Sequence, residues 1–326
     1  MQKFGSAIAR CRPMKRMLAV AIAMLFAVAF EPAAVLSTAF PQQDDRTISV
    51  DVELVNVLFT VFDRNGKFIK NLNQEQFRVF EDNKPQTITN FSSETGLPLT
   101  IALLIDASGS VRDRLRFEQE AAIQFFHTTL RRGADRGLLI RFDSGVDLLQ
   151  DYTDDPAALA AAVQEIRAGG GTALYDAVYL AVTKKLTGQP GRRVIILISD
   201  GDDNSSRISM TETLEAAQRN DVSIYTISTN ATSPSKSREQ ETGDKVLRKF
   251  AEETGGKAFF PLRLQELSGD FLHISEELRS QYTIAYRSSN LQKDGAFRRI
   301  RIEVANKNYQ VRARSGYYAP RAASAK

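Results

Sequence analysis

The sequence predicts an α/β fold, a doubly wound and mostly parallel sheet, together with a small all-β module supplied by its two flanks. Strands alternate with helices over residues 97–268, which is the rhythm of a parallel sheet covered on both faces. The segments 99–105 and 194–199 are apolar almost throughout, as is typical of strands buried on both sides. Residues 46–95 and 269–318 contain short strands separated by turns, which indicates antiparallel pairing.

Residues 1–39 have the composition of an export leader. Five basic residues precede an apolar run at 17–30, and Ser37-Thr38-Ala39 offers the small residues that a signal peptidase accepts. The run is shorter than the ~20 residues of a membrane-spanning helix. We therefore expect a cleaved signal peptide and an exported protein, periplasmic or extracellular. An uncleaved N-terminal membrane anchor is the alternative.

Charge and cysteine content argue against two classes of function. The leader carries a net charge of +4, equal to that of the whole chain, so the remainder is neutral and has no basic excess for nucleic acid. Cys11 precedes the apolar run and would leave with the leader, so no thiolate metal site is expected in the mature protein. His127 and His273 lie in no cluster of ligand residues, which argues against zinc.

The segment 46–95 is expected to form three to five short strands without chemistry of its own. Residues 48–63 alternate over their first half, and Arg64-Asn65-Gly66 provides a hairpin turn. Shorter strands are predicted at 77–82 and 86–91, around a turn at residues 83–85.

The central segment, 97–268, is expected to build the sheet and its helices. Strands are predicted at 99–106, 136–143, 145–152, 192–200, 222–229 and 257–260. Helices are predicted at 111–130, 156–166, 174–186, 211–219 and 243–256. Asp154, Asp155 and Pro156 suit a helix start, and Gly255-Gly256 suits a helix end. Residues 229–242 are polar and are predicted to be a long loop.

The segment 269–318 completes a helix predicted at 264–281 and then returns to strands. These are expected at 282–288, 297–304 and 309–318, with a turn at Asp294-Gly295. The two β flanks could pair into one small sandwich, with the central segment inserted between them. Residues 319–326 are expected to be a polar tail.

Oxygen-bearing side chains follow strands of the predicted sheet on three separate loops. Asp106 ends the first strand, with Ser108 and Ser110 in the same turn; Thr172 follows three glycines; Asp200 ends the strand at 192–199. Because ligands bind at the carboxyl ends of such strands, we expect these five to converge. Two carboxylates and three hydroxyls suit Mg²⁺ or Mn²⁺, with Ca²⁺ less expected, and leave a position for an incoming carboxylate.

These motifs resemble those of the von Willebrand factor type A domain. DASGS, at 106–110, looks like the family's DxSxS motif, and GGGT and ISDG, ending at Thr172 and Gly201, stand where the family has its other two. TGGKAFF, at 254–260, is similar to the family's last strand. The resemblance covers about residues 97–268, and the β flanks and closing SGYY look like bacterial exported members. It implies a metal-ion-dependent adhesion site with Ser108 and Ser110 as direct ligands, and Thr172, Asp106 and Asp200 bound directly or through water.

Some residues near this site have simpler interpretations. Taken alone, Asp106 would be a helix-capping turn residue with Ser110 as the N-cap. Gly109 and Gly171 flank the expected ligands, and Asp202 and Asp203 extend the acidic rim; these four are candidate partner contacts. For the two aspartates a solvated turn is the simpler interpretation. Asp176, in the first turn of its helix, is explained by the helix dipole.

The function expected is binding, not catalysis. A divalent cation would capture an Asp or Glu side chain of a protein partner, with no nucleic-acid partner and with membrane contact only through an uncleaved leader. The alternative is a structural component of an envelope complex, in which the metal only pins loops. A hydrolase would need a general base that the sequence does not place near the ion, and an Asp-nucleophile phosphatase would need a second Asp where Ser108 stands.

Overall fold

The computed structural model describes residues 54–93, 96–230, 237–261 and 266–322. The predicted leader at 1–39, the start of the first predicted strand and the end of the predicted tail lie outside the described residues. Within these ranges, no helix combines the length and the apolar character needed to cross a membrane.

The central sheet has six strands in the order β10-β9-β8-β5-β6-β7. Their bounds are β5 (Leu99–Asp106), β6 (Arg136–Phe142), β7 (Val146–Thr153), β8 (Arg192–Ser199), β9 (Val222–Ser228) and β10 (Ala258–Phe259). Neighbours are parallel except β6 and β7, which form an antiparallel hairpin. The predicted fold class is therefore confirmed.

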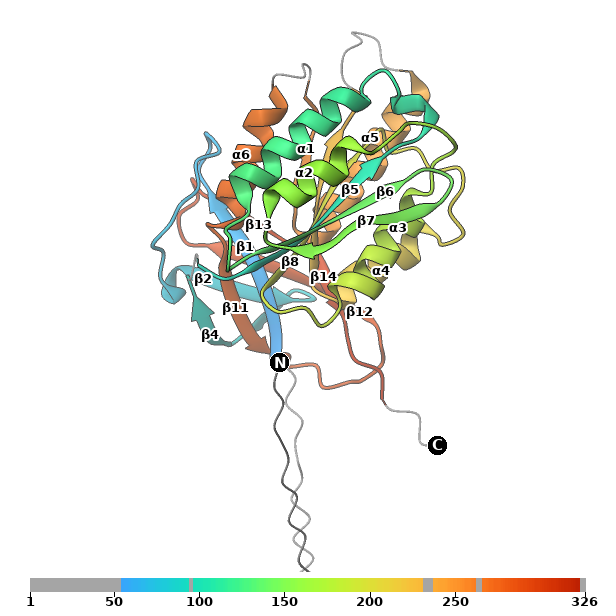
Figure 1. Cartoon of the computed structure of the whole chain (residues 1–326). Coiled ribbons are helices and arrows are strands. Elements are labelled where there is room, and N and C mark those ends of the chain that lie inside the picture. Colours follow the sequence, from blue (N-terminus) through green and yellow to red (C-terminus); the bar gives the residue numbers. More distant parts are fainter. Residues whose placement is uncertain (1–53, 94–95, 231–236, 262–265, 323–326) are drawn as a thin grey trace, which may run out of the picture. The chain divides into compact units, whose positions relative to one another are not determined.

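Helices cover both faces of this sheet (Figure 1). One face carries α1 (Leu115–Thr129), α2 (Pro156–Gln164) and α6 (Glu266–Leu278). The other carries α3 (Leu174–Leu180), its π-helical continuation η3 (Ala181–Leu186), α4 (Met210–Arg219) and α5 (Arg238–Thr254). Successive side chains of β5 enter opposite clusters: Leu103 packs with the first set of helices and Leu104 with the second. This two-sided burial explains why the strand is apolar throughout.

The two flanks pair into one β module of two four-stranded sheets, ordered β13-β1-β11-β4 and β14-β12-β2-β3. The N-terminal strands are β1 (Leu54–Phe62), β2 (Phe77–Glu81), β3 (Lys84–Gln86) and β4 (Ile88–Ser92), with the 3-10 turn η1 (Gln74–Gln76) between β1 and β2. The C-terminal strands are β11 (Tyr282–Arg287), β12 (Phe297–Val304), β13 (Gln310–Ala313) and β14 (Gly316–Tyr318). Because β1 pairs with β11 and β13, and β2 with β12, the predicted pairing of the flanks is confirmed.

The structure corrects the predicted strands of this module. Lys84 and Pro85, predicted as a turn, belong to β3, and the turn is made by Asp82 and Asn83, whose φ angles are 47° and 65°. The segment 86–91 is divided between β3 and β4, which belong to different sheets. The segment 309–318 is likewise divided between β13 and β14.

Two predicted helix boundaries are also wrong. The helix predicted from residue 111 begins at Leu115, and the 3-10 turn η2 (Gly109–Val111) precedes it. The loop predicted at 229–242 ends earlier, because Ser237 caps α5 by accepting a hydrogen bond from the Gln240 backbone N–H. This capping box was a local signal that the polar composition of the segment concealed.

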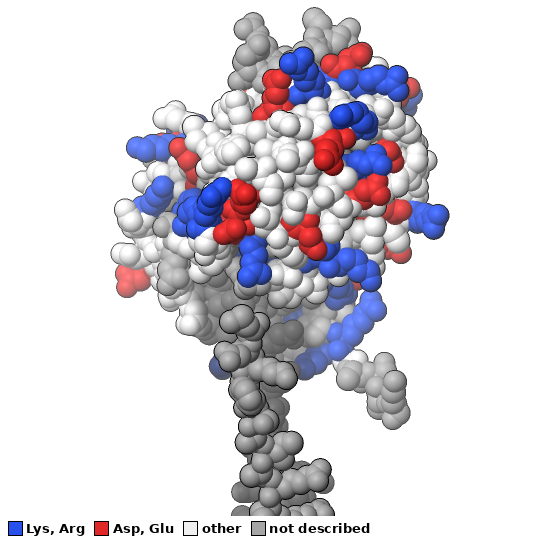
Figure 2. All heavy atoms as spheres, in the orientation of Figure 1, with Lys and Arg blue, Asp and Glu red and all other residues white. Residues whose placement is uncertain are grey.

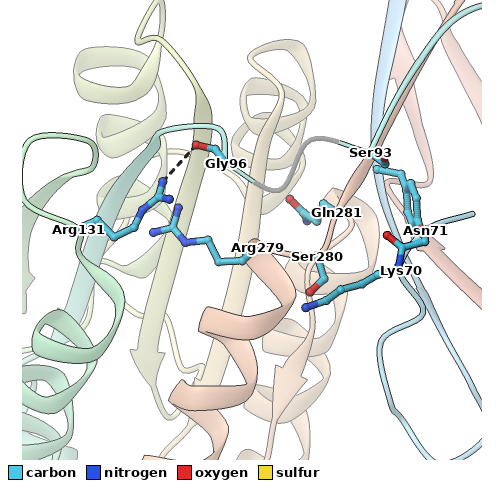
Figure 3. Close-up of a pocket in the computed structure, with 9 residues that line it drawn as sticks. Lys70, Asn71, Ser93, Gly96, Arg131, Arg279, Ser280 and Gln281 are labelled. Carbon is cyan, nitrogen blue, oxygen red and sulfur yellow. Dashed lines mark hydrogen bonds between the residues drawn. The ribbon is translucent and has the colours of Figure 1, made fainter.

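A buried carboxylate joins the start of β5 to the β module. Asp135, 1% exposed, accepts hydrogen bonds from the backbone N–H of Leu99 (2.9 Å) and from the guanidinium groups of Arg131 and Arg279. Arg279 lies between α6 and β11. Figure 3 shows both arginines on one side of a pocket of about 530 Å³, with Lys70 of the β module on the other.

This cluster predicts a dependence of stability on pH. Burial by itself would raise the pKa of Asp135, but hydrogen bonds from Arg279, Arg131 and two backbone N–H groups lower it. A carboxyl whose pKa is lower in the folded state stabilises the fold above the unfolded-state pKa of ~4, and this contribution is lost as the pH falls through the folded-state pKa. Asp135→Asn should cost about 3 kcal/mol at pH 7, measured by urea unfolding, and less at acidic pH.

The matched control is Asp113→Asn, at an exposed residue without a described hydrogen bond, which should change stability by less than about 0.5 kcal/mol. Equal unfolding free energies for Asp135→Asn and the wild type at pH 7 would show that the cluster does not stabilise the junction.

Candidate metal centre

Asp106 is fixed at the end of the central strand. It is completely buried, and its Oδ1 accepts a hydrogen bond from the backbone N–H of Ser108 at 2.9 Å. Its Oδ2 accepts one from the hydroxyl of Ser199, the last residue of β8, at 2.6 Å. The helix-capping interpretation is wrong, because Ser110 lies inside η2 and the N-cap of α1 is Arg114, without a side-chain cap.

The hydroxyls of the first loop connect it to the loop after β8. Ser108 Oγ lies 3.0 Å from Ser110 Oγ, and the Ser110 hydroxyl donates to Asp200 Oδ2 at 2.7 Å. Asp200 is 8% exposed. The structure thus brings four of the five predicted ligands, Asp106, Ser108, Ser110 and Asp200, into one chain of contacts.

Thr172 lies on a neighbouring loop that is held against the first. The Gly109 N–H donates to Gly170 O at 3.1 Å, and the Gly169 N–H donates to Ala107 O at 2.7 Å. The Thr172 N–H donates to Asn204 Oδ1 at 2.9 Å, so its backbone also contacts the loop after β8. Thr172 is buried, but its hydroxyl makes no described hydrogen bond to the other four residues.

The candidate partner contacts occupy different environments. Asp202 is exposed on the rim, and its backbone N–H donates to Asp200 Oδ1 at 3.2 Å. Gly171 is enclosed, because an added Cβ would lie 2.4 Å from Ser205 Oγ. Asp203 is not in a solvated turn: its Oδ2 accepts the backbone N–H of Tyr175 at 3.0 Å, at the start of α3.

Asp176 has a more specific role than a favourable position in the helix dipole. Its Oδ1 accepts the backbone N–H groups of Arg207 (3.0 Å) and Ile208 (2.9 Å). Asp203, in the loop after β8, accepts a hydrogen bond from the start of α3, and Asp176, in α3, accepts hydrogen bonds from that loop. The two aspartates therefore connect the loop to the helix. These reciprocal contacts position Asp200 from its C-terminal side.

Two backbone segments approach closely beside Asp200, and the sequence motifs do not indicate this contact. Gly201 has φ +82°, and a Cβ on Gly243 of α5 would lie 2.2 Å from the carbonyl oxygen of Asp200. The Asn230 side-chain amide donates to the same oxygen at 2.6 Å. Helix α5 therefore presses directly on the backbone of a candidate ligand, which leaves room only for glycine at position 243.

The electrostatics of the site call for a positive charge. Burial raises the pKa of Asp106 to about 6, against the effect of hydrogen bonds from Ser199 and Ser108, and the charge of Asp200 adds to the increase. Neither Asp106 nor Asp200 forms an ion pair with any described Lys, Arg or His. Two buried carboxylates beside two hydroxyls therefore fit a divalent cation that prefers oxygen ligands.

Carboxylates alone would not form this site. Among the described residues, no group of three or more His, Cys, Asp or Glu side chains is placed to hold a metal ion. A cation bound at Asp106 and Asp200 would therefore depend on the hydroxyl oxygens of Ser108 and Ser110.

A third buried carboxylate near the site was not singled out from the sequence. Glu118, in the first turn of α1, is 1% exposed, and neither of its carboxylate oxygens has a described hydrogen-bond partner. Burial raises its pKa well above the usual value; the charges of Asp106 and Asp200 raise it further, and Arg114 lowers it. Its side chain thus lies within electrostatic range of both acidic ligands.

Comparison with known proteins identifies the central segment. The family model of the von Willebrand factor type A domain matches residues 100–271, more than half of the chain. No curated protein sequence matches significantly.

Similar solved structures include three with low sequence identity. A von Willebrand factor type A protein from Catenulispora acidiphila is 14% identical, over 73% of this chain and 75% of that one, with a TM-score of 0.48. The conserved hypothetical protein BatB from Bacteroides thetaiotaomicron is 20% identical, over 57% and 100% of the chains, with a TM-score of 0.45. Proximal thread matrix protein 1 from the mussel byssus, in a structure with a zinc-occupied MIDAS motif, is 15% identical, over 61% and 49%, with a TM-score of 0.47.

The contact between α5 and the loop after β8 gives a prediction. Gly243→Ala should push the Asp200 carbonyl away and cost about 1–3 kcal/mol of unfolding free energy, measured in urea. The matched control is Gly269→Ala in α6, where an added Cβ meets no atom within 4 Å, so the helix should be unchanged or stabilised by up to ~1 kcal/mol. Equal changes in the unfolding free energy for the two substitutions would contradict the close contact between Gly243 and the Asp200 carbonyl.

Proposed function

Because this chain belongs to the von Willebrand factor type A domain family, we propose that it is an exported binding module that holds a carboxylate of a protein partner through a divalent cation. The observation that carries the proposal is the pair of buried carboxylates, Asp106 and Asp200, which hydrogen bonds of Ser108 and Ser110 connect and which no described basic side chain neutralises. A bound cation would supply the missing charge and one open coordination position.

The proposed ligands have distinct tasks. Ser108 and Ser110 would offer neutral oxygens, so that only Asp106 and Asp200 contribute charge and the occupied site stays close to neutral. That balance favours approach of a third, external carboxylate. Thr172 would contribute a further oxygen from the glycine-rich loop. The Ser110 hydroxyl donates a hydrogen bond to Asp200. To bind the cation, this hydroxyl would rotate so that its oxygen, and not its proton, faces the cation.

Mg²⁺ or Mn²⁺ is the cation that these donors favour. All five candidate side chains offer oxygen, which suits hard cations with octahedral coordination. Ca²⁺ takes up to eight oxygen ligands and often bidentate carboxylates, so a set of five side chains with only two carboxylates suits it less well than an octahedral cation.

The surroundings support binding to protein. His127 lies in the last turn of α1, and the His273 ring packs on those of Phe68 and Phe259, with centroids 4.9 and 6.0 Å away. This packing argues against His273 as a general base. Acidic and basic side chains intermingle on the face shown in Figure 2, as expected for a surface that does not select nucleic acid. The composition of residues 1–39 supports export.

A second candidate function is structural. The loops are already connected without a cation: Ser199 donates to Asp106, Ser110 donates to Asp200, and Gly109 donates to Gly170. This observation favours a centre in which the metal reinforces the loops, and in which partners bind elsewhere.

Metal binding predicts a thermal shift. A cation that binds only the folded chain, at a hundred times its dissociation constant, adds about 2.7 kcal/mol of stability, or roughly 5–10 °C in Tm. Mg²⁺ or Mn²⁺ should produce this rise over EDTA in the purified chain and in Asp113→Ala, but not in Asp106→Ala or in the milder Ser110→Ala. Wild-type protein whose Tm is unaffected by millimolar metal would contradict the proposal.

The two candidate functions differ in their response to a free carboxylate. Under the first, glutarate should shift the backbone amide NMR signals of Gly109, Thr172 and Asp202 when Mg²⁺ is present, and not in EDTA or in Asp200→Ala. Under the second, Mg²⁺ should raise Tm but glutarate should leave these signals unchanged.

A further inference from the structure

Glu118 occupies a position that the packing of the fold does not explain. It shares the inward face of α1 with Leu115 and Ala122, three residues before it and four after it, which both belong to the apolar core. A carboxylate there, without a hydrogen bond or an ion pair, loses its hydration without compensation. Leucine or glutamine at position 118 would destabilise the fold less than an unpaired carboxylate does, unless a cation is bound nearby.

Other buried carboxylates in this protein have compensating partners. Glu277 is paired with Arg312 at 2.6 Å, and Asp135 with Arg131 and Arg279. Glu81 accepts a hydrogen bond from the Tyr286 hydroxyl at 2.9 Å and lies 3.6 Å from Arg298. Glu118, Asp106 and Asp200 have no such basic partner among the described residues.

The charged groups that act on Glu118 lie on three elements. Asp106 ends β5, Asp200 follows β8, and Arg114 lies in the turn that leads into α1. The Arg114 carbonyl accepts the Glu118 N–H at 3.1 Å, but the Arg114 guanidinium forms no described ion pair with the Glu118 carboxylate. The negative charges of Asp106 and Asp200 oppose ionisation of Glu118. A cation bound at these two carboxylates would offset their effect on Glu118.

We propose that Glu118 is the outer-sphere carboxylate of the metal centre, which accepts a hydrogen bond from a water molecule bound to the cation. This inference rests on the metal centre of the proposed function. Direct ligation does not fit, because the described residues hold no cluster of three acidic side chains at ligand distance. Through the water, Glu118 fixes the orientation of one coordination position, and this fixed hydrogen bond strengthens cation binding.

The test compares Mn²⁺ affinity in the purified chain and in Glu118→Gln, by calorimetry and by electron paramagnetic resonance of the bound ion. Loss of an outer-sphere partner typically weakens metal binding 10–100-fold, and we expect a loss in this range together with an altered Mn²⁺ spectrum. Unfolding in urea without metal should show Glu118→Gln to be as stable as the wild type or more so. That result separates a role at the metal from a role in folding.

Glu120→Gln is the matched control. Glu120 lies two residues further along α1, is 62% exposed and pairs with Arg116, so its Mn²⁺ affinity and spectrum should equal those of the wild type. Glu118→Leu, which suits the apolar surroundings, should lose affinity as Glu118→Gln does and provides the same test if the glutamine variant does not fold.

The outcomes separate this inference from the proposed function. Wild-type affinity and spectrum in Glu118→Gln or Glu118→Leu would overturn the role of Glu118 and leave the metal centre standing. Absence of Mn²⁺ binding by the wild-type chain would overturn the metal centre itself, and this inference with it.

Discussion

Burial of Asp106 at the carboxyl end of β5 constrains the three loops around it. Its two oxygens are held by the Ser108 N–H and the Ser199 hydroxyl, so the turn after β5 is fixed to the end of β8. That connection brings Ser110 to Asp200. Because β5 is packed on both faces, Asp106 cannot move without the sheet, and the geometry of the candidate centre is inherited from the core.

The centre and the β module lie at opposite ends of the same strand (Figure 1). The Leu99 N–H, at the start of β5, binds Asp135, which also holds Arg279 just before β11. Asp106 lies seven residues further along, roughly 23 Å away at the rise of an extended strand. The metal centre and the β module are therefore separated by the length of β5.

The sheet and its acidic rim could be predicted because they follow from local patterns. Apolar strands that alternate with helices imply parallel pairing, and the carboxyl ends of parallel strands meet at one edge. The division of 86–91 and 309–318 between two sheets could not be predicted, since alternation with a period of two is the same in either sheet.

The buried charges were missed for a different reason. Glu118 looks like a residue of the solvent-facing side of a helix, and its burial depends on how α1 packs on the sheet. Asp135 has one partner nearby in the sequence, Arg131, but its contacts with Leu99 and Arg279 join residues 36 and 144 positions apart, and these the sequence does not indicate. Tertiary contacts determine the burial of both carboxylates, whereas the hydroxyls and carboxylates of the metal loops lie within recognisable sequence motifs.

The pairing of β1 with β11 also joins two segments that are far apart in the chain. Leu54 pairs with Arg287, and the whole α/β domain lies between them in the chain. During synthesis, β1 emerges long before its neighbours and presents an unpaired edge with alternating apolar residues, the kind of segment that associates with other chains. Folding of the α/β domain brings the ends of β4 and β11 together and shortens the effective loop that β1 must close. The pairing of β1 with β11 can therefore form only after the whole inserted domain has been synthesised.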